Sequence, residues 1–247
     1  MTLYSCGAHI DENGRATGGK RGDQTGREVS SVEYYDYPWS YALRYCGAKP
    51  KTVRNRIMQT AWILAKKNKV GYSQSDRDSL FNAMMTRKFS MKKLLTIPKC
   101  NTDCSAFVGV VVSCALVPIG LYTFVPSDIW TGNEYEYLTK RGFKKMKKSV
   151  DFETGEGLMP GDILVNPLYH TEIFMGFKKS GKLYSVVSKT EPTKTEITDA
   201  ELEKIANRVI DGEFGNGSER VDALKAAGYD PVRVQEKVNE ICSRYGL

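Results

Sequence analysis

A sharp boundary between polar and apolar residues constrains the fold of this chain more than any other feature. Thr102, Asp103, Cys104 and Ser105 lead into a mostly apolar run over residues 107–117. This run is shorter than the ~18 residues of a membrane span and predicts a buried helix that starts near Cys104. Because unpaired N–H groups give a helix N-terminus about half a positive charge, this position favours a thiolate over a thiol.

An activated thiol also needs a base, most often a histidine, within hydrogen-bond reach. The chain contains two histidines, His9 and His170. His170 lies between two β-like runs, residues 162–165 and 171–177, so it is predicted to begin a strand. His9 lies in a segment without periodicity. The pattern therefore favours His170 as the partner of Cys104, although a buried cysteine is more often a small apolar residue.

Helical spacing over residues 52–69 precedes β-like runs after residue 160, which indicates an α+β fold. The sequence Asp-Cys-Ser-Ala-Phe at 103–107, and residues 161–164 followed by 170–173, form two further motifs. They resemble the nucleophile and histidine motifs of the NlpC-like papain-fold peptidoglycan peptidases. Segments 18–26 and 130–134 resemble a phage and prophage subgroup of these lysins. The resemblance covers most of residues 1–188 and implies a papain-like catalytic domain, with helices first and an antiparallel sheet after.

The residue that orients the histidine is not fixed by the pattern. The resembled family uses His, Asn or Gln on the next strand, where this chain offers Ser185 and Ser188. Glu172 would share a strand face with His170 because side chains alternate, and Glu191 is a second possibility. A carboxylate stabilises an imidazolium better than a hydroxyl does, so we prefer Glu172.

The resemblance implies an enzyme, either a cysteine endopeptidase or an N-acetylmuramoyl-L-alanine amidase, that needs no metal or cofactor. Cys104 would attack an amide carbonyl and His170 would protonate the leaving amine. The backbone N–H of Cys104 is a natural oxyanion donor, and Tyr72, in a segment similar to the family's pocket tyrosine, could be a second. The family favours the bond between D-glutamate and the diamino acid, while the sugar-to-peptide amide and the cross-bridge stay open.

A second signal lies at the C-terminus. Residues 189–199 read as a polar linker, and residues 200–247 predict three short helices. This region resembles the cell-wall-binding repeat of some phage lysozymes, which binds peptidoglycan. We expect its contacts with the wall to involve Phe214, Gly215, Asn216, Gly217 and Arg220.

Composition limits the possible partners. The chain has 247 residues and a net charge of +7, with a basic cluster of Lys140, Arg141, Lys144, Lys145, Lys147 and Lys148. A basic surface attracts anionic wall polymer and nucleic acid alike. From the motifs we expect peptidoglycan and no nucleic acid as the partner, a monomer, and no membrane span. The first thirty residues lack the apolar core of a secretory signal, so we expect synthesis in the cytoplasm and action at the cell wall after release.

A different interpretation of the cysteines and His9 competes with the peptidoglycan hydrolase. Cys6, His9, Cys100 and Cys104 have spacings acceptable for a four-ligand zinc site, which would make a metal-stabilised nucleic-acid-binding protein. That alternative leaves the His170 motif and the C-terminal repeat unexplained. Residues 1–40, rich in Gly and charge, fit an extended N-terminal arm over the site.

Overall fold

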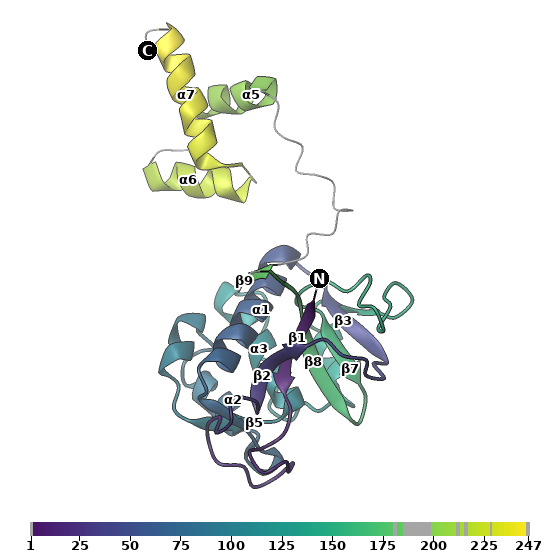
Figure 1. Ribbon diagram of the computed structural model, residues 1–247. Helices are drawn as coiled ribbons and strands as arrows, with labels where there is room; N and C mark the ends of the chain where they lie inside the picture. Colours follow the sequence, from purple (N-terminus) through teal and green to yellow (C-terminus); the bar gives the residue numbers. More distant parts are fainter. Residues whose placement is uncertain are drawn as a thin grey trace. The chain divides into compact units, whose positions relative to one another are not determined.

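The computed structural model describes residues 2–179, 182–184, 199–210, 213–214, 217–227 and 229–245. The chain divides into two compact units, Met1–Val186 and Val187–Leu247 (Figure 1). Residues 189–198 of the predicted linker, which include Glu191, lie outside the described residues, and so do Ser185 and Ser188.

An antiparallel sheet is the framework of the first unit. Its strands follow the order β2-β1-β8-β7-β3-β6, and β9 pairs with the far end of β8. The strands are β1 (Leu3–Ala8), β2 (Val29–Glu33), β3 (Tyr41–Tyr45), β6 (Phe143–Met146), β7 (Ile163–Asn166), β8 (His170–Lys179) and β9 (Lys182–Tyr184). Two further strands, β4 (Val70–Tyr72) and β5 (Cys100–Thr102), form a separate parallel pair. The unit is therefore α+β, as predicted.

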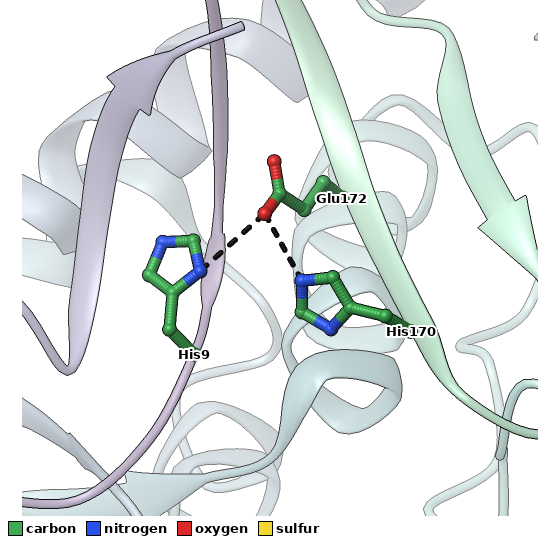
Figure 2. Close-up of side chains that lie close together, drawn as sticks. All are labelled: His9, His170 and Glu172. Carbon is green, nitrogen blue, oxygen red and sulfur yellow. Dashed lines mark hydrogen bonds and ion pairs between the residues drawn. The ribbon is translucent and has the colours of Figure 1, made fainter. Parts of the chain in front are cut away.

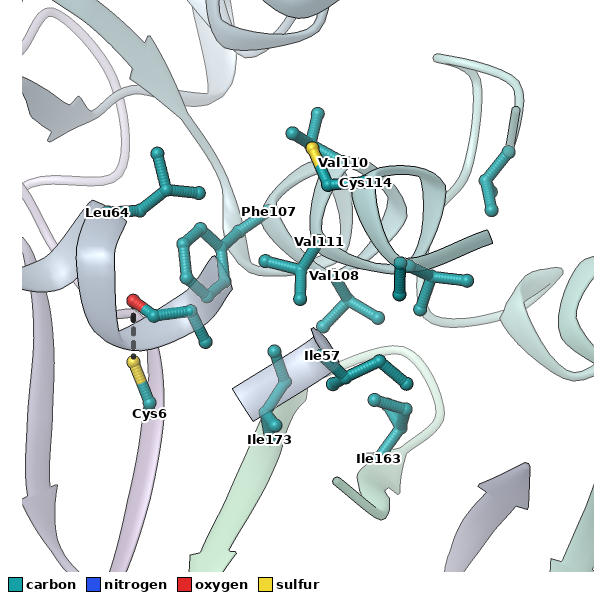
Figure 3. Close-up of a cluster of buried hydrophobic side chains, with 14 of the residues drawn as sticks. Cys6, Ile57, Leu64, Phe107, Val108, Val110, Val111, Cys114, Ile163 and Ile173 are labelled. Atoms are coloured by element: carbon teal, nitrogen blue, oxygen red, sulfur yellow. Dashed lines mark hydrogen bonds between the residues drawn. The ribbon is translucent and has the colours of Figure 1, made fainter. Parts of the chain in front are cut away.

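Helices fill the sequence between the strands of the first unit. They are α1 (Pro50–Lys66), α2 (Ser79–Met85), α3 (Cys104–Leu116) and α4 (Glu134–Thr139), with short 3-10 turns η1 (Gln74–Asp76), η2 (Met91–Thr96) and η3 (Val117–Ile119). Every residue of α3 is buried, as its apolar sequence requires (Figure 3). Helices α1 and α3 contact each other, and both contact β1 and β8. The predicted buried helix is thus the centre of the core.

Alternation along the strands gives the sheet two different faces. Leu43, Ile163 and Ile173 belong to the main core with α1 and α3, while their neighbours Leu164 and Phe174 belong to a smaller cluster around Trp39. Because strand side chains point to opposite faces in turn, this division follows directly from the paired register of β3, β7 and β8. Both faces of the central strands are covered.

Two parts of the expected N-terminal arm, residues 3–8 and 29–33, are strands of the sheet instead. Strand β1 pairs with β8 in the interior of the sheet, and β2 pairs with β1. Cys6 and Ala8 are completely buried in the main core. Strand β1 is short, and its last four residues, Ser5, Cys6, Gly7 and Ala8, are small, so its pattern is weak in the sequence. Its stability comes from pairing on both edges.

The basic cluster surrounds β6, which ends the strand order of the sheet. Lys144 is exposed on this edge strand, and the Lys145 ammonium lies 4.2 Å from the centroid of the Tyr41 ring. Lysines on an edge strand discourage pairing with other chains, which gives these charges a structural role.

The second unit contains helices α5 (Asp199–Ile210), α6 (Gly217–Ala226) and α7 (Pro231–Tyr245). Their apolar stripes form a separate small core of Leu202, Ile205, Ala206, Val209, Leu224, Val234, Val238 and Ile241. Within the described parts of both units, we find no helix with the length and apolar character needed to cross a bilayer.

Candidate active site

Cys104 is the first residue of α3, where the sequence predicted it. Asp103 caps the helix, because its side chain accepts a hydrogen bond of 2.8 Å from the backbone N–H of Ala106. The Arg77 guanidinium donates to the Asp103 carboxylate at 2.5 and 3.1 Å. The polar residues before the apolar run therefore hold the helix start in place.

The thiol of Cys104 is more buried than a free thiolate tolerates. Only 8% of the residue is exposed, and burial, followed by the carboxylates of Asp103 and Glu134, raises its pKa to about 12. Backbone hydrogen bonds from Thr171 and Ser105 act in the opposite direction. The helix end alone does not ionise this cysteine, contrary to the expectation from its position, because desolvation outweighs the N-terminal charge. A raised pKa favours the thiol over the thiolate at neutral pH.

The same contacts bring Cys104 to the start of β8. The sulfur accepts from the amide of Thr171, which directly follows His170 in the chain. Helix α3 packs against β8 along this line. The structure therefore brings together the two motifs that the sequence separates by more than sixty residues.

His170 and Glu172 form a hydrogen-bonded pair on β8. The Nε2 atom of His170 lies 3.0 Å from Oε1 of Glu172, whose side chain is fully buried (Figure 2). Burial raises the pKa of Glu172, but the hydrogen bond from His170 and the nearby charges of His9 and His170 outweigh it, so the pKa is lowered overall. A carboxylate accepts hydrogen bonds only, so Nε2 donates and Nδ1 of neutral His170 is left as the basic nitrogen.

His9 also reaches Glu172, although the sequence pattern gave it no position. Its Nδ1 lies 3.4 Å from the same Oε1 atom, and the centroids of the two imidazole rings are 6.0 Å apart. The Tyr35 hydroxyl donates to this oxygen as well, at 2.9 Å. Gly7 makes room for the carboxylate, because a Cβ at that position would lie 2.8 Å from Cγ of Glu172.

Aromatic side chains surround the imidazole of His170. The Trp39 ring stacks on it with centroids 6.0 Å apart, and the Tyr37 ring meets its edge at 5.8 Å. Burial raises the pKa of Tyr37, and Cys104 and Glu172 raise it further, which places this phenol near both. The segment 34–39 is rich in aromatic residues, and that composition was the available signal for a site-lining segment.

Tyr72 lies near the thiol of Cys104. It ends β4, where its register partner is Thr102, two residues before Cys104. Burial, and then the proximity of Cys104, raises its pKa to about 12. The phenol therefore stays protonated at neutral pH and can donate a hydrogen bond.

Glu134 is a site residue that the sequence reasoning did not single out. Its side chain is completely buried, and Oε1 accepts a hydrogen bond of 3.0 Å from the Thr171 hydroxyl. Burial raises its pKa to about 8. It therefore supplies a carboxyl group beside Cys104 that is largely uncharged at neutral pH.

The four-ligand zinc alternative does not fit the structure. The thiols of Cys6 and Cys100 point at different backbone carbonyls, those of Ala61 and Lys69. Among the described residues, a different group of three has the spacing of metal ligands, namely His9, His170 and Glu172.

The second unit carries a groove beside α6 and α7. Its volume is about 540 Å³, and its lining includes Arg220, Asp230, Gln235 and Asn239. Arg220 donates to Oε1 of Gln235 at 3.2 Å, which holds the guanidinium over the groove. Among the expected wall-contact residues that the structure describes, Arg220 lines this groove.

Phe214 belongs to the core of the second unit rather than to the groove. Its ring packs against Tyr229 at 6.3 Å and under the Arg208 guanidinium at 5.0 Å. Gly217 begins α6, while Gly215 and Asn216 lie outside the described residues. Gln235 and Asn239 belong to the stretch that resembles the wall-binding repeat but were not among the expected contact residues, because their one-turn spacing is also typical of an ordinary solvated helix face.

Comparison with known proteins defines the class of both units. Residues 5–181 match the Endolysin-like domain family, and the chain belongs to this family. Residues 203–242 match the CW_7 repeat. A lysozyme of Streptococcus phage Cp-7 is 59% identical over 53 residues, which are 22% of this chain and 16% of that lysozyme. No solved structure shows detectable similarity to the chain.

Proposed function

We propose that this protein is a peptidoglycan hydrolase of phage endolysin type, which cuts an amide bond of the stem peptide through a cysteine acyl-enzyme. The observation that carries the proposal is that the Cys104 sulfur, at the start of α3, accepts from the backbone N–H of Thr171. Thr171 lies in β8 between His170 and Glu172, which form a hydrogen-bonded pair. A helix-borne cysteine beside a strand-borne histidine also supports a papain-like arrangement within the endolysin-like fold.

The raised pKa of Cys104 determines the order of the proton transfers. Nδ1 of His170 takes the thiol proton as the sulfur attacks the amide carbonyl, so no thiolate accumulates before substrate binds. Glu172 holds Nε2–H and stabilises the imidazolium that forms. The imidazolium then protonates the leaving amine, and water releases the acyl group from the sulfur.

The developing oxyanion needs donors about 3 Å away. The backbone N–H of Cys104 at the helix start and the Tyr72 hydroxyl are the proposed donors. Next to His170, Leu168 and Tyr169 are exposed, and the Leu168 N–H donates to Thr131 Oγ1 at 3.0 Å. This connection gives a fixed apolar rim on which a stem peptide can rest.

The second unit is proposed to hold the enzyme on the wall. The match to the CW_7 repeat and the groove around Arg220 support this role. Attachment raises the local concentration of cleavable bonds without adding contacts at the catalytic site. For the bond that is cut, the resemblance favours the link between D-glutamate and the diamino acid, with the sugar-to-peptide amide and the cross-bridge as alternatives.

Replacement of Cys104 tests the proposal. We expect Cys104→Ser to lower lysis of purified cell walls by roughly 10³-fold or more, because the nucleophile is lost, while wall binding stays normal. Cys46→Ser changes an exposed cysteine and is the matched control. Retained lysis by Cys104→Ser would exclude the mechanism, and mass spectrometry of digested walls identifies the bond.

A further inference from the structure

We propose that His9, His170 and Glu172 form a binding site for a divalent transition metal, Zn²⁺ in particular, and that metal bound there switches the enzyme off. Each of the three residues offers one ligand atom, and these atoms lie within 4.8 Å of one another. His9 Nδ1 and His170 Nε2 both face Glu172 Oε1 (Figure 2). Two imidazoles and one carboxylate are a common ligand set for zinc with an open fourth position.

The spacing of the ligands agrees with this metal. Tetrahedral zinc with bonds of about 2.0–2.1 Å has ligand-to-ligand edges of about 3.3 Å. The two edges to Glu172 Oε1 measure 3.4 Å from His9 and 3.0 Å from His170. The two histidine side chains are 20% and 14% exposed, so they have room to turn into the position that the third edge of the tetrahedron requires. Their exposure also gives an ion a path to the fully buried carboxylate.

The hydrogen bonds of His9 prepare it as a ligand. Its Nε2 lies 3.4 Å from the backbone carbonyl of Ser30, which can only accept, so Nε2 carries a proton. In the neutral ring, the Nδ1 lone pair then points at Glu172 Oε1, which has lone pairs of its own. Two acceptors at this distance repel unless a positive charge lies between them. An imidazole that donates one N–H to a carbonyl and offers its other nitrogen is the usual state of a metal-bound histidine.

Metal binding and the proposed catalysis exclude each other. In the catalytic state His170 Nε2 donates to Glu172, and Nδ1 is free to accept the thiol proton. A metal at Nε2 binds through the lone pair of that nitrogen, so the ring proton must lie on Nδ1 instead. His170 can then no longer accept the thiol proton. Glu172 is taken from the histidine at the same time. Inhibition therefore rests on the proposed function, whereas binding of the metal does not.

The test measures binding first, in the full-length Cys104→Ser protein, so that neither the catalytic thiol nor activity enters the result. Titration with ZnCl₂ is followed by calorimetry, and titration with CoCl₂ by visible absorption. We expect one site with nitrogen and oxygen ligands, and a loss of at least tenfold in affinity in His9→Gln. Tyr35→Phe is the matched control, because it removes a competing donor from Oε1 and keeps every ligand. Its affinity should be equal or higher.

A second measurement does not depend on a variant. The chain has two histidines, so both rings are resolved in a ¹⁵N spectrum. Zinc should shift Nδ1 of His9 and Nε2 of His170 together. A shift at one ring, or unchanged affinity in His9→Gln, would overturn the site. In the wild-type protein, zinc should inhibit wall lysis and a chelator should restore it; stimulation by zinc would contradict the inhibitory role and indicate a metallohydrolase instead.

Discussion

The two units of this chain place their proposed functional groups in opposite environments. In the first unit, Glu172 and Glu134 are completely buried, and Cys104 is nearly so. In the second unit, Arg220 and its neighbours line an open groove on a small helical core. Buried polar groups act strongly because water does not screen them, and each of them depends on the exact position of its partners. Exposed groups act weakly and independently of one another.

The largest effect should follow from a change to the buried carboxylate. Glu172→Gln keeps the shape of the side chain but removes the charge that stabilises an imidazolium at His170. We expect a loss of about 10³ to 10⁴-fold in the rate of wall lysis, similar in size to the same change in a Ser-His-Asp triad. The measurement is turbidity clearance of purified walls. Glu156→Gln, at an exposed position, should retain full activity. A loss below tenfold in Glu172→Gln would show that this carboxylate does not orient the histidine.

A substitution on the neighbouring strand β1 can displace the Glu172 side chain. A Cβ at residue 7 would lie 2.8 Å from Cγ of Glu172, so Gly7→Ala must displace the carboxylate. We expect a rate loss of about 10 to 100-fold and a destabilisation of about 1–3 kcal/mol, typical of overpacking. The decisive measurement is a double-mutant cycle with Glu172→Gln. If Gly7→Ala costs the same activity in both backgrounds, it does not act through Glu172.

A smaller effect is expected in the second unit. Arg220→Ala should weaken wall binding by about tenfold, the value of one charge-assisted hydrogen bond lost, without a change in the cutting of soluble muropeptides. Pull-down with purified walls measures the first quantity, and chromatography of the products measures the second. Arg233→Ala removes an exposed arginine outside the groove and is the control. Equal binding by both variants would remove the groove from the proposed wall contact.

The difference between the units also explains what the sequence could predict. The start of α3 was predictable because a capping aspartate, a cysteine and an apolar run are adjacent in the chain. The alternation of β8 was enough to put Glu172 on the same face as His170. His9 and Gly7 were not predictable as site residues, because their role arises from the pairing of β1 with β8, which joins segments more than 160 residues apart in the sequence. Local pattern carries no information on such a pairing.

Burial is also the reason why the sequence did not predict the charge state of the Cys104 thiol. A helix N-terminus favours a thiolate by a modest amount, typically about 0.3–1 kcal/mol. Desolvation of Cys104 exceeds that, and the sequence does not reveal how completely packing closes around the sulfur. The groove in the second unit shows the converse, since its polar residues keep the exposure that a helical pattern predicts.

The smallest expected effect concerns stability and its dependence on pH. The pKa of Glu134 is about 8 in the folded protein, mainly because of burial, and lies above the ordinary value of a glutamate. Folding therefore favours the protonated form, and this contribution is complete below the ordinary pKa and is lost as pH rises toward 8. Glu134→Gln cannot ionise and still accepts the hydrogen bond from Thr171. We expect this variant to be more stable than the wild type at pH 8 by about 1–2 kcal/mol, with a smaller difference at pH 5.

Thermal unfolding at both pH values measures this difference, and Glu136→Gln is the control because its side chain is exposed on the same helix. A variant that loses stability equally at both pH values would mean that Glu134 is charged in the folded protein and bound to a partner. The reactivity of the Cys104 thiol gives a second test, since an ionised Glu134 raises the pKa of that thiol. In Glu134→Gln that opposing charge is absent, so alkylation of Cys104 at pH 8 should be faster than in the wild type. A slower reaction would show that the carboxyl group assists the thiol instead.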